Sequence, residues 1–233
     1  MLCGYSNGFI NPINSSNNIL VRKKMKEINM LNRLELEHGQ LLRKLNFLEL
    51  QYLEMCRGDT PDYSLMRNII IFVQEYPEQI HHPLEDMIFS ILLERVDDAG
   101  SVQELISEHT HLETVTRELR DSLDSISSGP VDTEKLKQQL STFLVAQRKH
   151  IYTEETEVYP LVKSALTEED WKRLENMVPI VDEPIYGKRT RYDYERLSRE
   201  IEDKNMMRML SGRNENMSSA KANFSQFVNY ITE

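Results

Sequence analysis

The chain has 233 residues, of which 39% are hydrophobic and 28% are charged, and its formal net charge is −10. This is the composition of a globular protein with enough apolar residues for a core. The acidic balance disfavours nucleic acid as a partner, because phosphate binding needs clustered lysines and arginines, and the one basic run, residues 21–26, is interpreted as the solvated start of a helix. Only eight glycines and eight prolines favour long helices over many short strands.

Several features predict a cytoplasmic protein. Its two cysteines, Cys3 and Cys56, are far apart and form no CxxC motif, which is usual in a reducing compartment. The apolar run 69–73 is far too short to span a membrane. The first twenty residues lack the basic and apolar regions of a signal peptide. We therefore expect no membrane partner.

The first predicted helix follows a segment, residues 1–29, that is expected to be disordered. From Leu31 to Met55, apolar residues recur at alternating steps of three and four, which is the seam of a bundled helix. His38 occupies one of the seam positions. Glycine and proline in 57–61 predict the end of this helix.

The second predicted helix covers residues 62–96 and carries apolar residues on one side. Pro77 and Pro83 interrupt it, because proline lacks the backbone N–H that a helix interior needs. The pattern therefore predicts one long, kinked helix. His81 and Glu85 lie between its apolar halves.

The third and fourth predicted helices repeat the pattern. The third covers about residues 101–127 and places His109 in its apolar seam. The fourth covers about residues 132–161 and carries His150 and Glu154 in its apolar stripe.

These four amphipathic helices, joined by short loops, predict an all-α fold, an up-down-up-down four-helix bundle with additional C-terminal helices. The bundle is assigned to residues 30–176, including a short helix that opens at Thr167. Residues 177–233 are expected to form a C-terminal extension, with an outer helix over 194–210 and a polar tail.

Each helix of the bundle places a histidine where an apolar side chain is expected, and two of these histidines are followed by glutamate four residues later. Residues at i and i+4 share one helical face. Burying such groups without a partner costs several kcal/mol, and metal coordination removes this cost. The candidate metal ligands are His38, His81, Glu85, His109, His150 and Glu154.

The ligand types indicate which metal to expect. Imidazole and carboxylate suit iron, manganese or zinc, and the lack of thiolate argues against a structural zinc site. Four imidazoles and two carboxylates fit two ions about 3.5–4 Å apart, with Glu85 and Glu154 as bridges. Carboxylate-bridged pairs in four-helix cores favour iron. The expected cofactor is two non-haem iron ions, with manganese or zinc less favoured.

Four nearby residues are alternatives. His82 and Asp86 repeat the spacing one residue further along, about 100° round the helix. They are predicted to face the surface or to contact the ligands from outside, with coordination left open. Glu113 is expected to be a solvated charge, although its position one turn after the seam histidine leaves coordination open. Glu155 is the alternative to its neighbour.

Four segments carry a resemblance to a known family. The segments IHHPLEDMIF and HIYTEETEVYPLV resemble the HHxxE and HxxxEE signatures of the hemerythrin-like, HHE cation-binding family. LEHGQLL and SEHTHLE are similar to its single-histidine helices. The resemblance covers about residues 30–176, and the combination is specific. DEPIYGKRT and the helix after it are similar to a C-terminal extension in a bacterial subgroup.

This resemblance implies a di-iron site with the six candidates at the family's ligand positions. It also implies that the molecule handled is dioxygen, nitric oxide, peroxide or iron itself. Oxygen-carrying hemerythrins have five histidines, two of them on the third helix at HxxxH spacing, and here Glu113 occupies the second position. Four histidines leave the ions more open, which disfavours pure reversible oxygen carriage.

The sequence therefore favours a protein that binds or senses O2, NO or redox and iron status. One alternative is a di-iron enzyme or repair factor, which reduces peroxide or NO or donates iron to damaged iron–sulfur clusters. Another is a metal-free helical scaffold. The sequence names no protein partner.

Overall fold

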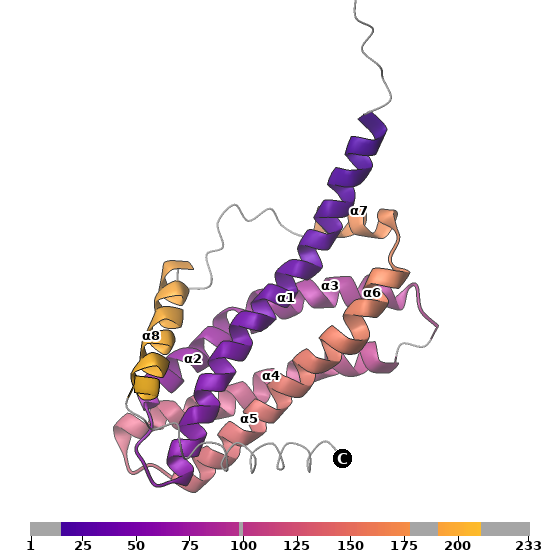
Figure 1. Cartoon of the computed structure of the whole chain (residues 1–233). Coiled ribbons are helices and arrows are strands. Elements are labelled where there is room, and N and C mark those ends of the chain that lie inside the picture. The colour runs from indigo at the N-terminus through magenta and orange to yellow at the C-terminus, as the bar shows by residue number, and fades with distance from the viewer. Residues whose placement is uncertain (1–14, 98–99, 178–190, 211–233) are drawn as a thin grey trace, which may run out of the picture.

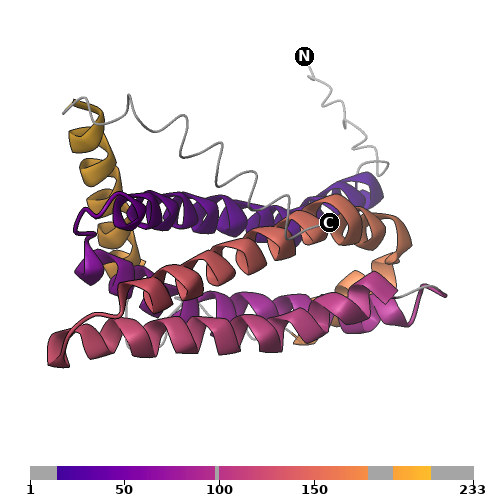
Figure 2. The same cartoon turned by 90° about the horizontal axis from the view of Figure 1, so that it is seen from below.

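The computed structural model describes residues 15–97, 100–177 and 191–210. The bundle within them consists of four long helical segments, which pack lengthwise against one another (Figures 1 and 2). This confirms the predicted all-α bundle. The second and fourth segments each contain a π-helical turn. In chain order the segments are α1 (Ser15–Cys56); α2 (Tyr63–Glu75) with η2 (Pro77–His81) and α3 (His82–Leu93); α4 (Gly100–Ser125), followed by the 3₁₀ turn η3 (Ile126–Ser128); and α5 (Thr133–Thr153) with η4 (Glu154–Val158) and α6 (Tyr159–Ala165).

Helix ends are set by local sequence. Gly58 follows α1 with a φ of 80°, a left-handed conformation that glycine adopts without a steric penalty. The side chain of Asp62 accepts a hydrogen bond from the N–H of Leu65 at the start of α2. Asp132 caps α5 in the same way through the N–H of Lys135. These caps satisfy backbone donors that have no partner within a helix.

The first helix is longer than the sequence pattern predicts. It begins at Ser15, so residues 15–29, which were expected to be disordered, are helical in the structure. Most residues from 19 to 30 are good helix formers, such as leucine, arginine, lysine, methionine and glutamate. Residues 1–14, the rest of the expected disordered segment, lie outside the described residues.

The bundle has two apolar clusters, with the histidines between them along the helices. On α1, His38 lies between Leu34 of one cluster and Leu41 of the other. On α4, His109 lies between Leu105 and Val115 in the same way. A buried polar layer therefore separates two hydrophobic cores within one bundle.

The C-terminal helices pack onto this bundle, as predicted. Helix α7 (Glu168–Met177) buries Trp171 and Leu174 in the cluster near α3. Helix α8 (Arg191–Leu210) lies across α1 and α2 and buries Tyr194, Leu197 and Ile201 (Figure 1). The predicted polar tail falls in residues 211–233, outside the described part of the chain. Among the helices described, none combines the length and the apolar character that crossing a membrane requires.

Candidate metal centre

Two π-helical turns lie beside the histidine layer, and the sequence pattern did not predict them. In η2 the N–H of His82 donates to the carbonyl of Pro77, five residues earlier. In η4 the N–H of Tyr159 donates to the carbonyl of Glu154, again five residues earlier. A π-helical turn contains more residues than an α-helical turn, so it changes which side chains face the core. The η2 turn ends at a candidate ligand and the η4 turn begins at one.

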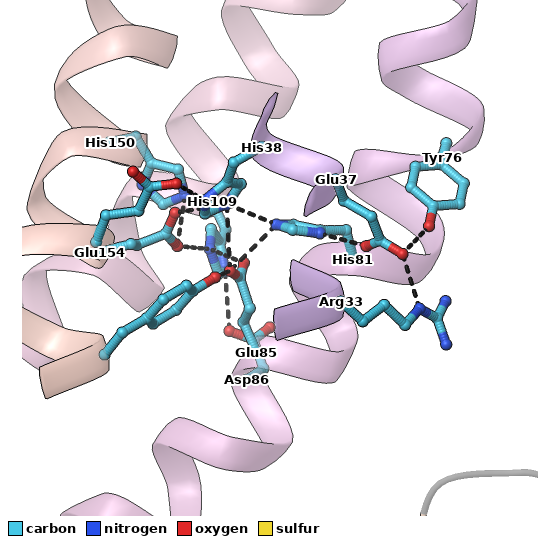
Figure 3. Close-up of polar contacts among 12 residues, drawn as sticks. Arg33, Glu37, His38, Tyr76, His81, Glu85, Asp86, His109, His150 and Glu154 are labelled. Atoms are coloured by element: carbon cyan, nitrogen blue, oxygen red, sulfur yellow. Dashed lines mark hydrogen bonds and ion pairs between the residues drawn. The ribbon is translucent and has the colours of Figure 1, made fainter. Parts of the chain in front are cut away.

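Two buried carboxylates lie at the centre of the polar layer (Figure 3). Oε1 of Glu85 is 3.1 Å from Nε2 of His81, and its Oε2 is 3.6 Å from Nε2 of His109. Oε2 of Glu154 is 3.3 Å from Nε2 of His38, and its Oε1 is 3.0 Å from Nε2 of His150. Each carboxylate thus has one oxygen near the pair His38 and His81 and its other oxygen near the pair His109 and His150.

The structure brings all six predicted ligands together from four helical segments. Five of them, together with His82, form two overlapping groups in each of which the donor atoms lie within 4.8 Å of one another, and Glu154 lies beside both groups through His38 and His150. Glu85 belongs to both groups. The groups are His38, His81 and Glu85, and His82, Glu85, His109 and His150.

His82 corrects the sequence interpretation, because it faces the core and is only 4% exposed. Its ring stacks on that of His109, with centroids 4.2 Å apart. The prediction that it turns about 100° away assumed a regular α-helix. The η2 turn breaks that assumption, because His82 closes an i→i+5 hydrogen bond and both His81 and His82 are buried.

Several buried atoms of the centre make no hydrogen bond within the described residues. They are Oε2 of Glu85, both side-chain oxygens of Glu154, and Nε2 of His109 and of His150. Unpaired buried carboxylate and imidazole atoms are costly. A bound cation satisfies oxygen and nitrogen lone pairs that converge in this way, so the residues fit a metal.

The opposite nitrogen of each histidine contacts a second set of acids, which we call the outer carboxylates: Glu37, Asp86, Glu108 and Glu155. The Nδ1 atoms of His38, His81, His109 and His150 lie 3.1, 2.8, 2.9 and 3.3 Å from oxygens of Glu155, Glu37, Asp86 and Glu108, respectively. Metal-binding histidines commonly have such a partner on the nitrogen that does not bind the metal. The sequence interpretation missed Glu37 and Glu108.

Residues 29–162 match the family model of the hemerythrin HHE cation binding domain. The chain belongs to this family. The matched region contains all six predicted ligands and ends in α6. A search of curated proteins gives no match. Family membership and the histidine–glutamate cluster together support a metal cofactor.

Electrostatics within the HHE domain favour positive charge on His81 and His150 when no cation is bound. Burial opposes the imidazolium of His81, but the charge of Glu85 and the hydrogen bond with Glu37 outweigh it and raise its pKa to about 10. Burial likewise opposes the charge on His150, while Glu154 and Glu108 raise its pKa to about 9. A bound cation would take the place of these protons.

The pKa values of His82 and Glu154 are shifted downward. Burial, together with the neighbouring His109 and His150, lowers the pKa of His82 well below its usual value, so its ring is neutral. Burial opposes the charged form of Glu154, yet His150 and the other imidazoles hold its pKa well below the usual range. The centre therefore contains a permanent carboxylate charge.

Tyr159 is a further residue of the centre that the sequence interpretation missed. Its hydroxyl lies 2.5 Å from Oε1 of Glu85, and its ring stacks on His38 with centroids 5.7 Å apart. Burial and the charge of Glu85 raise its pKa, so the phenol stays protonated and donates a hydrogen bond to the carboxylate. Its spacing of five residues from Glu154 could not reveal this contact, because it depends on the η4 turn.

Three alternatives from the sequence lie at the edge of the centre or beyond it. Glu113 is exposed on α4, as expected, and does not belong to the groups of converging donor atoms. Glu155 contacts Nδ1 of His38 from outside. Asp86 does the same for His109. Both acids therefore support histidines from the outer side.

Proposed function

We propose that this HHE-domain protein holds two non-haem iron ions in a carboxylate-bridged centre and uses them to bind or sense O2 or NO. The observation that carries the proposal is the division of oxygens in Glu85 and Glu154 between two histidine pairs. A carboxylate that faces two histidine groups in this way is suited to bridge two cations.

The distances divide the ligands between two metal positions. His38 and His81 would hold one ion, and His109 and His150 the other, with Glu85 and Glu154 shared. His82 joins the second group as a fifth imidazole. Iron bound there would supply open coordination positions and redox electrons, and imidazole with carboxylate suits it. Manganese and zinc suit the same ligands but do not supply this redox chemistry with O2.

The space beside the centre favours a very small ligand. A hollow of about 10 Å³ adjoins His38 and His81. That is close to the smallest space that holds one water-sized molecule. Its other walls are the apolar side chains of Leu41, Phe72 and Pro77, together with Glu37 and Tyr76. An uncharged diatomic molecule fits such a space, whereas an organic substrate does not.

A second candidate function is a di-iron enzyme that reduces peroxide or NO, or a factor that donates iron to damaged iron–sulfur clusters. The observation that favours it is the buried hydroxyl of Tyr159, which donates to Glu85. Such a phenol holds a proton at the centre of the site, and reductions of peroxide or NO consume protons. Turnover of peroxide or NO by the iron-loaded protein, or recovery of cluster activity, separates this function from sensing.

The proposed function is tested by loading the metal-free protein with Fe(II) under anaerobic conditions. We expect a change in near-ultraviolet and visible absorption on exposure to air, and an electron paramagnetic resonance signal on addition of NO. If neither appears in protein that has retained iron, the proposal is wrong. A cytoplasmic location, proposed from the cysteine usage, is tested by cell fractionation.

A further inference from the structure

The four outer carboxylates are arranged in a closed circle around the bundle. Each is the sequence neighbour of a predicted ligand, but it contacts the histidine of a different helical segment. In order, Glu37 of α1 contacts His81, Asp86 of α3 contacts His109, Glu108 of α4 contacts His150, and Glu155 of η4 contacts His38 of α1. Each of the four segments thus provides one outer carboxylate and also carries one histidine that the carboxylate of another segment contacts.

The outer contacts decide which nitrogen faces the centre. An ionised carboxylate is only an acceptor, so each Nδ1 must donate its proton outward. A neutral imidazole in that tautomer has its lone pair on Nε2, and the Nε2 atoms of all four histidines face Glu85 or Glu154.

We propose that Glu37, Asp86, Glu108 and Glu155 are positioning residues that hold Nε2 of each histidine ready for a cation, and that Glu37 has the strictest role. This inference rests on the proposed metal centre and deepens it. None of the four acids needs to touch the cation.

Glu37 differs from Asp86 in how its two oxygens are used (Figure 3). Oε2 of Glu37 contacts Nδ1 of His81 at 2.8 Å, while Oε1 accepts hydrogen bonds from Nε of Arg33, at 2.7 Å, and from the hydroxyl of Tyr76. The Glu37 side chain is 11% exposed, whereas that of Asp86 is 45% exposed. Within the described residues, Asp86 makes its side-chain hydrogen bond with His109 alone.

These contacts predict different outcomes for two matched amide substitutions. Arg33 has only donors, so in Glu37→Gln the amide oxygen must take the Oε1 position and the NH2 group must face His81. Nδ1 of His81 then has to accept, its proton moves to Nε2, and Nε2 no longer binds a cation. In Asp86→Asn the amide is free to rotate and present its oxygen to His109, which keeps its tautomer.

The test uses zinc(II), a diamagnetic ion, so it does not depend on reaction with O2 or NO. Zinc affinity is measured by competition with a chromophoric chelator, and histidine nitrogens are observed by NMR in 15N-labelled protein. We expect Glu37→Gln to bind zinc roughly 10- to 100-fold more weakly and to lose the signal of a metal-bound Nε2 at His81. Asp86→Asn should lose only a few-fold. Circular dichroism establishes that both variants are folded.

Two further substitutions make the test specific for hydrogen-bond direction. Adding Arg33→Met and Tyr76→Phe to Glu37→Gln removes both side chains that donate to the Oε1 position, so the amide can rotate and zinc affinity recovers. A purely structural loss would not be repaired in this way. The inference is overturned if Glu37→Gln binds zinc as well as Asp86→Asn, or if the triple variant stays as weak as Glu37→Gln. Failure of iron-loaded wild type to respond to O2 or NO would instead contradict the proposed function.

Discussion

The imidazole rings of His82 and His109 are stacked, with their centroids 4.2 Å apart and their planes 4° from parallel. His82 is the first residue of α3, whereas His109 lies on α4. Oxygen-carrying hemerythrins have a second histidine on the third bundle helix, where this chain has Glu113. The stacking therefore places a fifth imidazole beside His109 from the preceding helical segment.

Replacing His82 by alanine is expected to lower the iron content from two ions per chain toward one, because it removes an imidazole from the group with His109 and His150. Metal analysis of purified protein measures this. His111→Ala is the matched control, since His111 is exposed on α4, and should retain both ions. Unchanged iron in His82→Ala would show that His82 only packs against His109.

Replacing Tyr159 by phenylalanine is expected to weaken metal binding and stability together. The change removes the hydroxyl that donates to Glu85, and loss of a hydrogen bond to a buried charged group costs roughly 1–3 kcal/mol. Urea unfolding and zinc titration measure the two effects. Tyr152→Phe is the control, because Tyr152 is 65% exposed. If the two variants have equal stability and equal zinc affinity, Tyr159 does not contribute to the metal centre.

Metal binding is expected to release protons at pH 7. The pKa values of His81 and His150, about 10 and about 9, lie above the usual value of about 6.5. In the metal-free protein, the protonated imidazoles therefore make their full contribution to folding stability below pH 6.5, and this contribution is lost as the pH rises through 9 and 10. A cation needs the neutral imidazole, so its affinity should increase as the pH rises from 6.5 toward 9.

Titration calorimetry with zinc(II), in buffers of different ionisation enthalpy, counts these protons. We expect release of more than one proton per chain at pH 7. No release at pH 7, or affinity that falls between pH 6.5 and 9, would contradict the charge state assigned to His81 and His150.

Lys44 is expected to destabilise the protein at neutral pH. It is 2% exposed, with its Nζ 4.3 Å from the centroid of the Phe72 ring and 3.3 Å from Oγ of Ser198 on α8. Burial, with a smaller effect from Arg43, lowers its pKa to about 8. The cost of burying the amine is thus fully present below pH 8 and disappears above about 10.4, the usual lysine value.

Lys44→Met should therefore raise the free energy of unfolding at pH 7 by roughly 1–3 kcal/mol, and the gain should shrink as the pH rises above 8. Urea unfolding at pH 7 and pH 9.5 measures it, with Lys172→Met at an exposed position of α7 as control. A loss of stability at pH 7 would mean that the contact with Phe72 outweighs the cost of burial.

The helices and the six candidate ligands were predictable because they rest on periodicity. Histidines at apolar seam positions, such as His38 and His109, contradict the local pattern, and a polar residue in a seam needs a buried partner. His–x3–Glu spacing then brings two side chains to one face without any tertiary information. The structure brings five of the six candidates into the groups of converging donor atoms, with Glu154 in contact with His38 and His150; whether they bind a metal stays a prediction.

The inward turn of His82 and the role of Tyr159 were not predictable in this way. Both depend on π-helical turns, in which an i→i+5 hydrogen bond shifts the facing of later residues. The outer carboxylates could not be predicted from the sequence for a different reason. Glu37 and Glu108 contact histidines of other helical segments, so only the packing of the bundle reveals them.

The measurement that tests the central claim most directly is the metal content of the purified chain after anaerobic loading with Fe(II), together with its absorption before and after exposure to air. The account predicts two iron ions per chain and a new near-ultraviolet and visible absorption in air, with at least one ion lost in Glu85→Ala and in Glu154→Ala. A chain that retains no iron, or one that keeps both ions without Glu85 and Glu154, would contradict the carboxylate-bridged centre.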